Sequence, residues 1–353
     1  MPRRVLLAFA LGLCSGAFAA PLTCGEPVQA PAAIAPLPAA VTGRVAFYAA
    51  LYDPRTLTVR RELTLGDTSE LHPLASLFKP LVVEGVLRDV DRGALALNTP
   101  LTTTAANRSI EAYPAGTHSL RDLARRALVQ SDNTASDLLQ LTYGAGRLAR
   151  EVRGRSPCTS VLLTTKAWWG AQAGLASSVL GPDLSSGAQR YADQPFEARV
   201  QTASALIAAS RSVTGPQVEA GLDAYFHGPG YTPDLELALQ NTSTAKAYTD
   251  LMARTLPGVT LQPKTRAVFR EALSHGCCTP KAPLPGQHFW AAKAGSGWRL
   301  LNLTGVVETN AGLLAYTYLN DGSNTQDAED LERQIPALVR WIAAGLRELL
   351  GGE

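Results

Sequence analysis

The 353-residue chain has almost no net charge, and no stretch beyond its N-terminus is apolar enough to cross a membrane. It contains 32 lysine and arginine residues against 30 aspartate and glutamate residues. A chain so balanced lacks the basic surface that attracts nucleic acids or anionic membranes. The sequence therefore excludes neither enzymes nor binding modules, but it argues against a nucleic-acid partner and against a membrane span.

Several signatures of common enzyme chemistry are also absent. The chain contains no G-x-S-x-G elbow, H-E-x-x-H, P-loop, G-x-G-x-x-G or C-x-x-C pattern. Its histidines are scattered and form no recognisable triad; they are His72, His118, His227, His275 and His288. The sequence thus predicts no cofactor and no metal, since a zinc site built from His275, Cys277 and Cys278 lacks the usual paired spacing.

The first residues have the pattern of a secretory signal peptide. Arg3 and Arg4 precede an apolar run, Val5 to Leu13, and Ala17-Phe18-Ala19 is a small-residue cleavage site. A lipoprotein is a poor alternative, because Cys14 follows a leucine rather than a small residue. We expect cleavage near Ala19 and a secreted or periplasmic bacterial protein, with residues 1–19 as signal peptide.

Three further features predict the domain organisation. Residues 20–43 are rich in proline and alanine, which is typical of a linker or a loosely held arm. Residues 44–353 follow as one domain. Alternating or β-branched patterns predict strands at 45–52, 57–63, 289–294, 300–307 and 313–319. Helical periodicity predicts helices at 77–87, 120–129, 135–141, 198–209, 245–256 and 327–350, the last kinked at Pro336.

Strands near both ends with helices between them predict an α+β fold of two lobes. One antiparallel sheet would be built from both ends of the chain, and an all-helical lobe would be inserted between them.

Ser76-Leu77-Phe78-Lys79 is the first candidate catalytic motif. On a helix, residues three apart share one face, with Cβ atoms about 5–6 Å apart. A serine hydroxyl needs a base to become a nucleophile, and a neutral lysine can be that base. Ser243-Thr244-Ala245-Lys246 has the same spacing, which we interpret as a helix cap with a solvated lysine.

Two further motifs follow Ser76 in the chain. In Ser131-Asp132-Asn133, the serine could relay a proton, the asparagine could hold a substrate amide, and the aspartate would brace the loop. A plain turn and helix N-cap before Thr134 is the alternative, because caps prefer serine, aspartate and asparagine. In Lys293-Ala294-Gly295, a lysine lies in an apolar strand, where it could hold a substrate carboxylate; an edge lysine that discourages strand pairing is the alternative.

The order of these three motifs resembles that of the serine β-lactamase and penicillin-binding protein superfamily, in particular its class A-like branch. The likeness extends to the segment from Tyr113 to Asp137, which leads into the Ser-Asp-Asn loop. It implies a helical lobe beside an antiparallel five-stranded sheet flanked by N- and C-terminal helices, with the site in the cleft between them. It also implies that Ser76 is acylated and that Lys79 is its base.

The remaining site residues follow from the same resemblance. Ser131 and Asn133 would line the site, and Lys293 would stand on the strand edge with Ala294 and Gly295. The N–H groups of Ser76 and Ser296 would form the oxyanion hole.

Two departures from the family pattern limit the prediction. Ala294 replaces a hydroxyl-bearing residue that would bind a substrate carboxylate, for which Ser296 or Arg299 could substitute. No carboxylate occurs from Val152 to Pro182, where the family's water-activating glutamate belongs, and Lys166 is expected to be a solvated surface lysine. We therefore expect slow deacylation.

Four cysteines remain after cleavage: Cys24, Cys158, Cys277 and Cys278. An even number in an exported protein favours disulfides over free thiols. Because adjacent cysteines rarely bridge each other, we expect Cys277 or Cys278 to bond a distant partner, most plausibly Cys158.

These observations predict an exported class A β-lactamase-like serine hydrolase that acts on β-lactams or related amides and esters. The alternatives are a D,D-peptidase or esterase of the same fold, and a penicillin-binding sensor-like module that is acylated without turnover. The sequence does not fix the physiological substrate or the oligomeric state.

Overall fold

The computed structural model describes residues 23–28, 34–110 and 115–351. The predicted signal peptide and its cleavage site lie outside the described residues, as do parts of the predicted arm and Tyr113. Within the described ranges, no helix combines the length and the apolar character that a membrane span requires.

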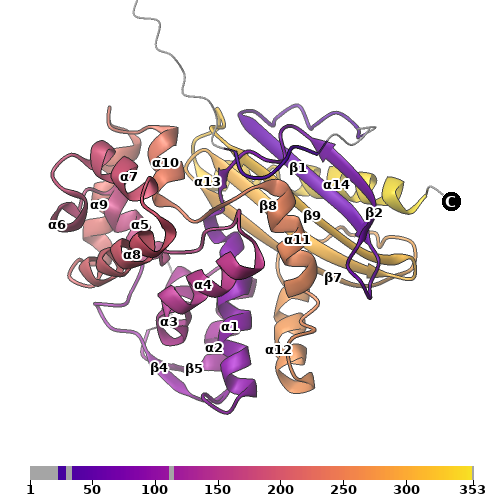
Figure 1. The fold of residues 1–353 in the computed structure, drawn as a ribbon, viewed down its shortest axis with the longest axis horizontal. Coiled ribbons are helices and arrows are strands. Elements are labelled where there is room, and N and C mark those ends of the chain that lie inside the picture. Colours follow the sequence, from indigo (N-terminus) through magenta and orange to yellow (C-terminus); the bar gives the residue numbers. More distant parts are fainter. Residues whose placement is uncertain (1–22, 29–33, 111–114, 352–353) are drawn as a thin grey trace, which may run out of the picture.

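A five-stranded antiparallel sheet is the centre of one lobe (Figure 1), and it joins strands from both ends of the chain as predicted. Its order is β2-β1-β9-β8-β7, so that β7 is an edge strand. The strands are β1 (Arg44–Tyr52), β2 (Val59–Leu65), β7 (Gln287–Gly297), β8 (Leu300–Thr309) and β9 (Gly312–Asp321).

Both faces of this sheet are covered. Successive side chains of β1 point to opposite faces of the sheet. Tyr48 and the other even-numbered residues from 46 to 52 pack into the core shared with the helical lobe, whereas Phe47, Ala49 and Leu51 pack into a second core. Helix α11 (Ala245–Thr255) covers the first face and α14 (Ile335–Leu350) covers the second (Figure 1). This double burial explains why the β1 sequence is apolar at nearly every position.

The described end of the predicted arm is packed rather than loose. Ile34 and Leu37 lie against the second core, and the indole N–H of Trp341 on α14 donates to the carbonyl oxygen of Ala35 at 2.7 Å. Trp341 also contacts the ring of Phe47 edge-on. The expectation of a loosely held arm is wrong for this segment, because its few apolar side chains supply part of the cover over the sheet.

The C-terminal helical region also differs from its prediction. It consists of two helices, α13 (Ala328–Glu332) and α14, in place of one kinked helix. Pro336 lies in the first turn of α14. Backbone N–H groups in the first turn of a helix have no partner within that helix, so the missing N–H of a proline costs no hydrogen bond there. The proline therefore helps to start a helix instead of bending one.

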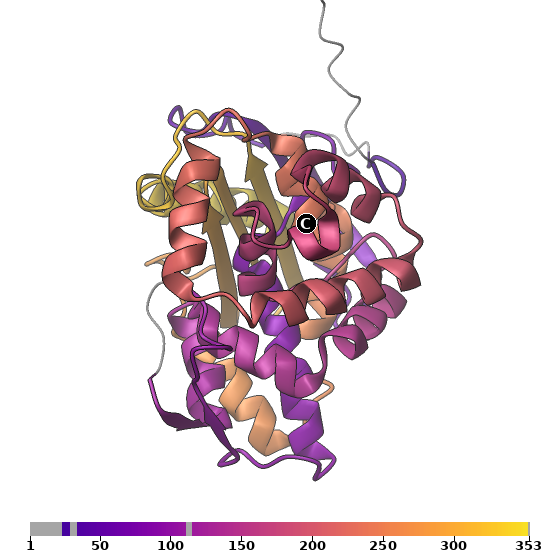
Figure 2. The ribbon, with the colours of Figure 1, turned by 90° about the vertical axis from the view of Figure 1, so that its left-hand side faces the viewer.

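The second lobe is helical, and Figure 2 views the molecule from its side. Its helices are α2 (Leu120–Val129), α3 (Asn133–Tyr143), α4 (Ala145–Arg155), α5 (Thr165–Gln172), α6 (Ser177–Leu180), α7 (Leu184–Ala192), α8 (Phe196–Ser210), α9 (Gly215–Phe226) and α10 (Pro233–Leu239). The 3-10 helix η1 (Ala75–Phe78), α1 (Lys79–Asp91) and α12 (Pro263–Ser274) lie between this lobe and the sheet. Short two-residue or three-residue strands pair as β3 (His72–Pro73) with β6 (Thr242–Ser243) and as β4 (Pro100–Thr102) with β5 (Thr117–Ser119).

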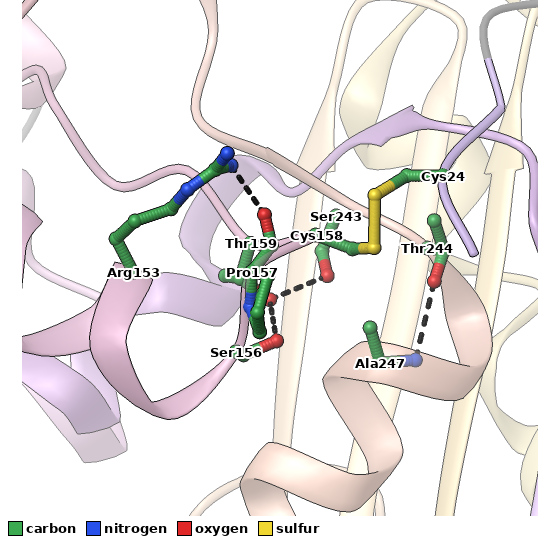
Figure 3. Close-up of a disulfide and its surroundings, with 9 residues drawn as sticks. All are labelled: Cys24, Arg153, Ser156, Pro157, Cys158, Thr159, Ser243, Thr244 and Ala247. Carbon is green, nitrogen blue, oxygen red and sulfur yellow. Dashed lines mark hydrogen bonds between the residues drawn. A yellow bond between two sulfur atoms is a disulfide. The ribbon is translucent and has the colours of Figure 1, made fainter. Parts of the chain in front are cut away.

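Two disulfides pair the four described cysteines, in a way that corrects the prediction. Cys158 does bond a distant residue, but that residue is Cys24 (Figure 3), and Cys277 bonds its neighbour Cys278. The adjacent pair is possible because Cys278 adopts a left-handed backbone conformation with φ of 84°. The Cys24–Cys158 bond ties the chain ahead of the sheet to the loop after α4.

Candidate active site

Ser76 lies on η1, a single turn of 3-10 helix that follows β3 and precedes α1. The serine and Lys79 therefore stand at the junction of two helices and not on one continuous α-helix. Ala75, just before the serine, has a φ of 45°, a conformation that residues other than glycine rarely adopt. Such strain persists only where the surroundings enforce it, and it is concentrated at functional sites.

Lys79 is fully buried, and its ammonium group is held by the Ser131-Asp132-Asn133 loop. Its Nζ donates to Oδ1 of Asn133 at 2.7 Å, to Oγ of Ser131 at 3.1 Å, and to the Ser131 carbonyl oxygen. Ser131 itself has a φ of 55°, so a second strained residue faces the first motif. The first two motifs, 52 residues apart, thus form one hydrogen-bonded unit.

Asp132 braces this loop as the sequence predicted. Its Oδ1 accepts the backbone N–H of Ala135 at 2.8 Å, and its Oδ2 pairs with Arg126 at 3.1 Å. Asp132 therefore caps α3, which the alternative of a plain turn and N-cap also predicts. The hydroxyl of Thr134 accepts the backbone N–H of Ser109 instead.

Lys293 completes the polar network from the edge strand β7. Its Nζ donates to Oγ of Ser131 at 2.8 Å and to the carbonyl oxygen of Ala294 at 2.5 Å. Burial lowers the pKa of Lys293 well below its usual value, and the nearby charge of Lys79 lowers it further. One serine hydroxyl thus lies within hydrogen-bond distance of two lysines, and the neutral form of Lys293 is favoured.

Gly295 allows β7 to approach the helix that carries Ser76. A Cβ at position 295 would lie 2.8 Å from the backbone nitrogen of Ser76 and 2.8 Å from the carbonyl oxygen of Leu74. Only glycine permits this contact. The close approach brings the main chain of β7, with Ser296 next in sequence, beside the main chain of the candidate nucleophile.

A cavity of about 280 Å³ opens above these residues. Ser76, Ser131, Asn133 and Ser296 all line it. The first two motifs therefore line one cavity between the two lobes, where the resemblance predicts the site. The third motif adjoins this cavity through Ser296, the next residue on β7, and through the bond from Lys293 to Ser131.

Glu236 on α10 also lines this cavity, and the sequence analysis missed it. Its carboxylate accepts one hydrogen bond from Nε2 of Gln172 at 2.8 Å and another from Nε2 of Gln240. Burial raises the pKa of Glu236 to about 7. The stretch from Val152 to Pro182 does lack a carboxylate, but the fold brings one to the cavity from beyond it.

Two residues differ from their predicted positions. The Nε of Arg299 donates to the carbonyl oxygen of Ser323 at 2.6 Å, and the side chain does not line the cavity, so Arg299 is no substitute for the missing hydroxyl. Lys166 is buried rather than solvated, and its Nζ donates to the carbonyl oxygen of Ala106 at 3.0 Å. Burial of the ammonium also lowers the pKa of Lys166.

The second S-x-x-K pattern lies outside the cavity. Ser243 is buried with its hydroxyl 2.8 Å from that of Thr159, beside the Cys24–Cys158 disulfide (Figure 3). Thr244 caps α11, and Lys246 pairs with Asp250 at 2.7 Å. This pattern is therefore structural, although the cap is the threonine and not the serine.

Comparisons with known proteins concern one segment of the chain and its fold. Residues 57–150 match the family described as "Beta-lactamase enzyme family". No curated protein matches the chain.

Solved structures of similar fold include β-lactamases from three bacteria. The one from Xanthomonas campestris is 20% identical, with 88% of this chain and 92% of that chain covered and a TM-score of 0.55. The one from Burkholderia vietnamiensis is also 20% identical, over 88% and 92%, with a TM-score of 0.56. The one from Chitinophaga pinensis is 17% identical, over 86% and 94%, with a TM-score of 0.54. Residues 57–150 are thus similar to this family, and the chain as a whole has the fold of these β-lactamases.

Proposed function

We propose that this chain is an exported serine hydrolase that forms an acyl-enzyme through Ser76. The observation that carries the proposal is the Lys79–Ser131–Lys293 network at the cavity that Ser76 lines. Burying two lysines beside the hydroxyl of Ser131 costs folding free energy. The two lysines and Ser131 would supply the proton acceptor and the proton path that Ser76 needs as a nucleophile.

The reaction would proceed in two steps. Lys79 first passes a proton through the hydroxyl of Ser131 to neutral Lys293. Oγ of Ser76 then attacks the substrate carbonyl carbon while its proton passes to Lys79, and the N–H groups of Ser76 and Ser296 stabilise the oxyanion. The carbonyl then re-forms, the bond to the leaving group breaks, and Ser131 passes a proton to the leaving group. Water later attacks the acyl-enzyme, releases the acid and restores the Ser76 hydroxyl.

We propose β-lactams or related amides and esters as substrates. A D,D-peptidase or esterase is the alternative enzyme, and a penicillin-binding sensor-like module would be acylated without turnover. The slow deacylation expected from the sequence stays a prediction, and Glu236 now offers a base that was not counted in it.

Mass spectrometry of the protein mixed with a penicillin or an activated thioester tests the proposal. We expect an adduct on the peptide that contains Ser76, none in Ser76→Ala, and a normal adduct in Ser243→Ala. Losing a nucleophile should cost many orders of magnitude in acylation rate. Acylation that survives Ser76→Ala would contradict the proposal.

A further inference from the structure

The cavity around Ser76 is lined by carboxylates at the end of β7. Glu329 and Glu332 project from α13, and Glu236 comes from α10. Within the described part of the chain, no lysine or arginine lines this cavity, because Lys79 and Lys293 lie behind its wall in the network around Ser131. The ionisable side chains that line the cavity near the end of β7 are therefore all acidic, whereas the charge of Lys79 is bound to Ser131 and Asn133 behind the wall.

The donors that a substrate carboxylate would need there are already engaged. The hydroxyl of Ser296 donates to Oε1 of Glu332 at 2.5 Å. Ala294 has no hydroxyl, and Arg299 is directed to the Ser323 carbonyl oxygen. An anionic group placed beside Ser296 would meet a carboxylate and no side-chain cation, which costs free energy.

A buried acceptor without a partner points to a ligand that donates a hydrogen bond. Gln240 lines the cavity and is only 8% exposed. Its Nε2 donates to Glu236, which leaves its Oε1 buried with no hydrogen-bond partner in the described residues. Such an acceptor is costly unless a donor fills it, and a bound N–H group would be that donor.

Aromatic rings form the rest of the wall. Phe226 at the end of α9 stacks on Trp298 of the β7–β8 turn, with ring centroids 5.0 Å apart and planes 16° apart. Both rings and Trp169 line the cavity. Aromatic faces beside carboxylates attract organic cations and tolerate apolar groups of varied shape.

We infer that this site selects ester or amide substrates that carry an ammonium group, over substrates that carry a carboxylate. The inference rests on the proposed function and narrows its substrate class. Glu329 and Glu332 determine the charge preference, the aromatic wall holds the apolar part of the substrate, and Gln240 accepts an N–H. Carboxylate-bearing penicillins would then be weak acylating agents.

Three thioesters of phenylacetic acid test the preference. They carry a para aminomethyl, ethyl or carboxylate group, so that size is nearly constant while charge runs from positive to negative. The acylation rate of each is divided by its rate of hydrolysis in hydroxide, which removes intrinsic reactivity. We expect the cation to acylate Ser76 at least about ten times faster than the anion, with the neutral ester between them, and the ratio should fall as salt is added.

The double variant Glu329→Gln/Glu332→Gln should bring this ratio close to one, whereas Glu348→Gln, an exposed change on α14 that leaves the cavity unchanged, should preserve it. An equal ratio in wild type and double variant, or faster acylation by the anion, would overturn the inference while leaving the acyl-enzyme in place. Failure of all three thioesters to acylate Ser76 would instead overturn the proposed function and this inference with it.

Discussion

At the scale of single residues, we propose that Glu236 is the base that activates water for deacylation, because it lines the same cavity as Ser76. A carboxylate can accept a proton from water only when it is ionised, and burial raises the pKa of Glu236 to about 7. Below that pH the group is protonated and cannot act as a base. Its two amide partners, Gln172 and Gln240, hold it at the wall of the cavity.

We predict that deacylation rises with pH through a midpoint near 7 and that Glu236→Gln lowers it by about 10²–10⁴, the usual value of general-base catalysis. The acyl-enzyme should then persist in the variant, as measured by mass spectrometry after a single turnover. Glu348→Gln is the control for the lost charge. Equal adduct lifetimes in wild type and Glu236→Gln would show that another group activates water.

The sequence could not reveal this residue. Glu236 lies more than fifty positions beyond Pro182, where the carboxylate-free stretch ends. Only the fold of helices α6 to α10 returns the chain to the cavity. That Lys79, Ser131 and Lys293 lie together beside the cavity that Ser76 lines was predictable, because short motifs specify the residue types and their order. The catalytic roles of these residues stay predictions. The side-chain direction of Arg299 was not, since no local pattern encodes it.

At the scale of elements, the contact between β7 and η1 positions the site. Because a Cβ at Gly295 would lie 2.8 Å from backbone atoms of Leu74 and Ser76, any side chain there must push the strand away from the serine. We predict that Gly295→Ala reduces the acylation rate at least ten-fold, measured with an activated thioester, because the oxyanion donors would separate.

Gly154→Ala is the matched control for that change. Its Cβ would meet nothing within 4 Å in helix α4, so we expect unchanged acylation and a gain of about 0.4–1 kcal/mol in the free energy of unfolding. Normal acylation by Gly295→Ala would show that the close approach is not needed for the chemistry.

Strands and long helices could be predicted because burial of one face places apolar residues at regular intervals in the sequence. The five sheet strands and α2 agree with their sequence patterns, since both depend on nearby residues. The arm at Ile34 and the first turn at Pro336 could not be predicted, because each depends on a partner that lies far away in the chain.

At the scale of the whole molecule, the Cys24–Cys158 disulfide ties the chain ahead of the sheet to the helical lobe across 134 residues. In the chain-entropy picture, a bond across a loop this long restricts the unfolded chain strongly, whereas Cys277–Cys278 closes almost no loop. We predict that Cys24→Ser/Cys158→Ser lowers the free energy of unfolding by about 3–5 kcal/mol, measured by urea denaturation. Cys277→Ser/Cys278→Ser should cost far less; equal losses would contradict this account.

The pairing of β1 with β9 also sets the time at which the site can exist. Arg44 bonds Asp321 across 277 residues, and the edge strand that carries Lys293 joins the sheet only through β8 and β9. During synthesis, Ser76 and Lys79 emerge early and have no partners from the C-terminal strands. The site that we propose for Ser76 therefore cannot form in a growing chain before the last quarter of the polypeptide has been made.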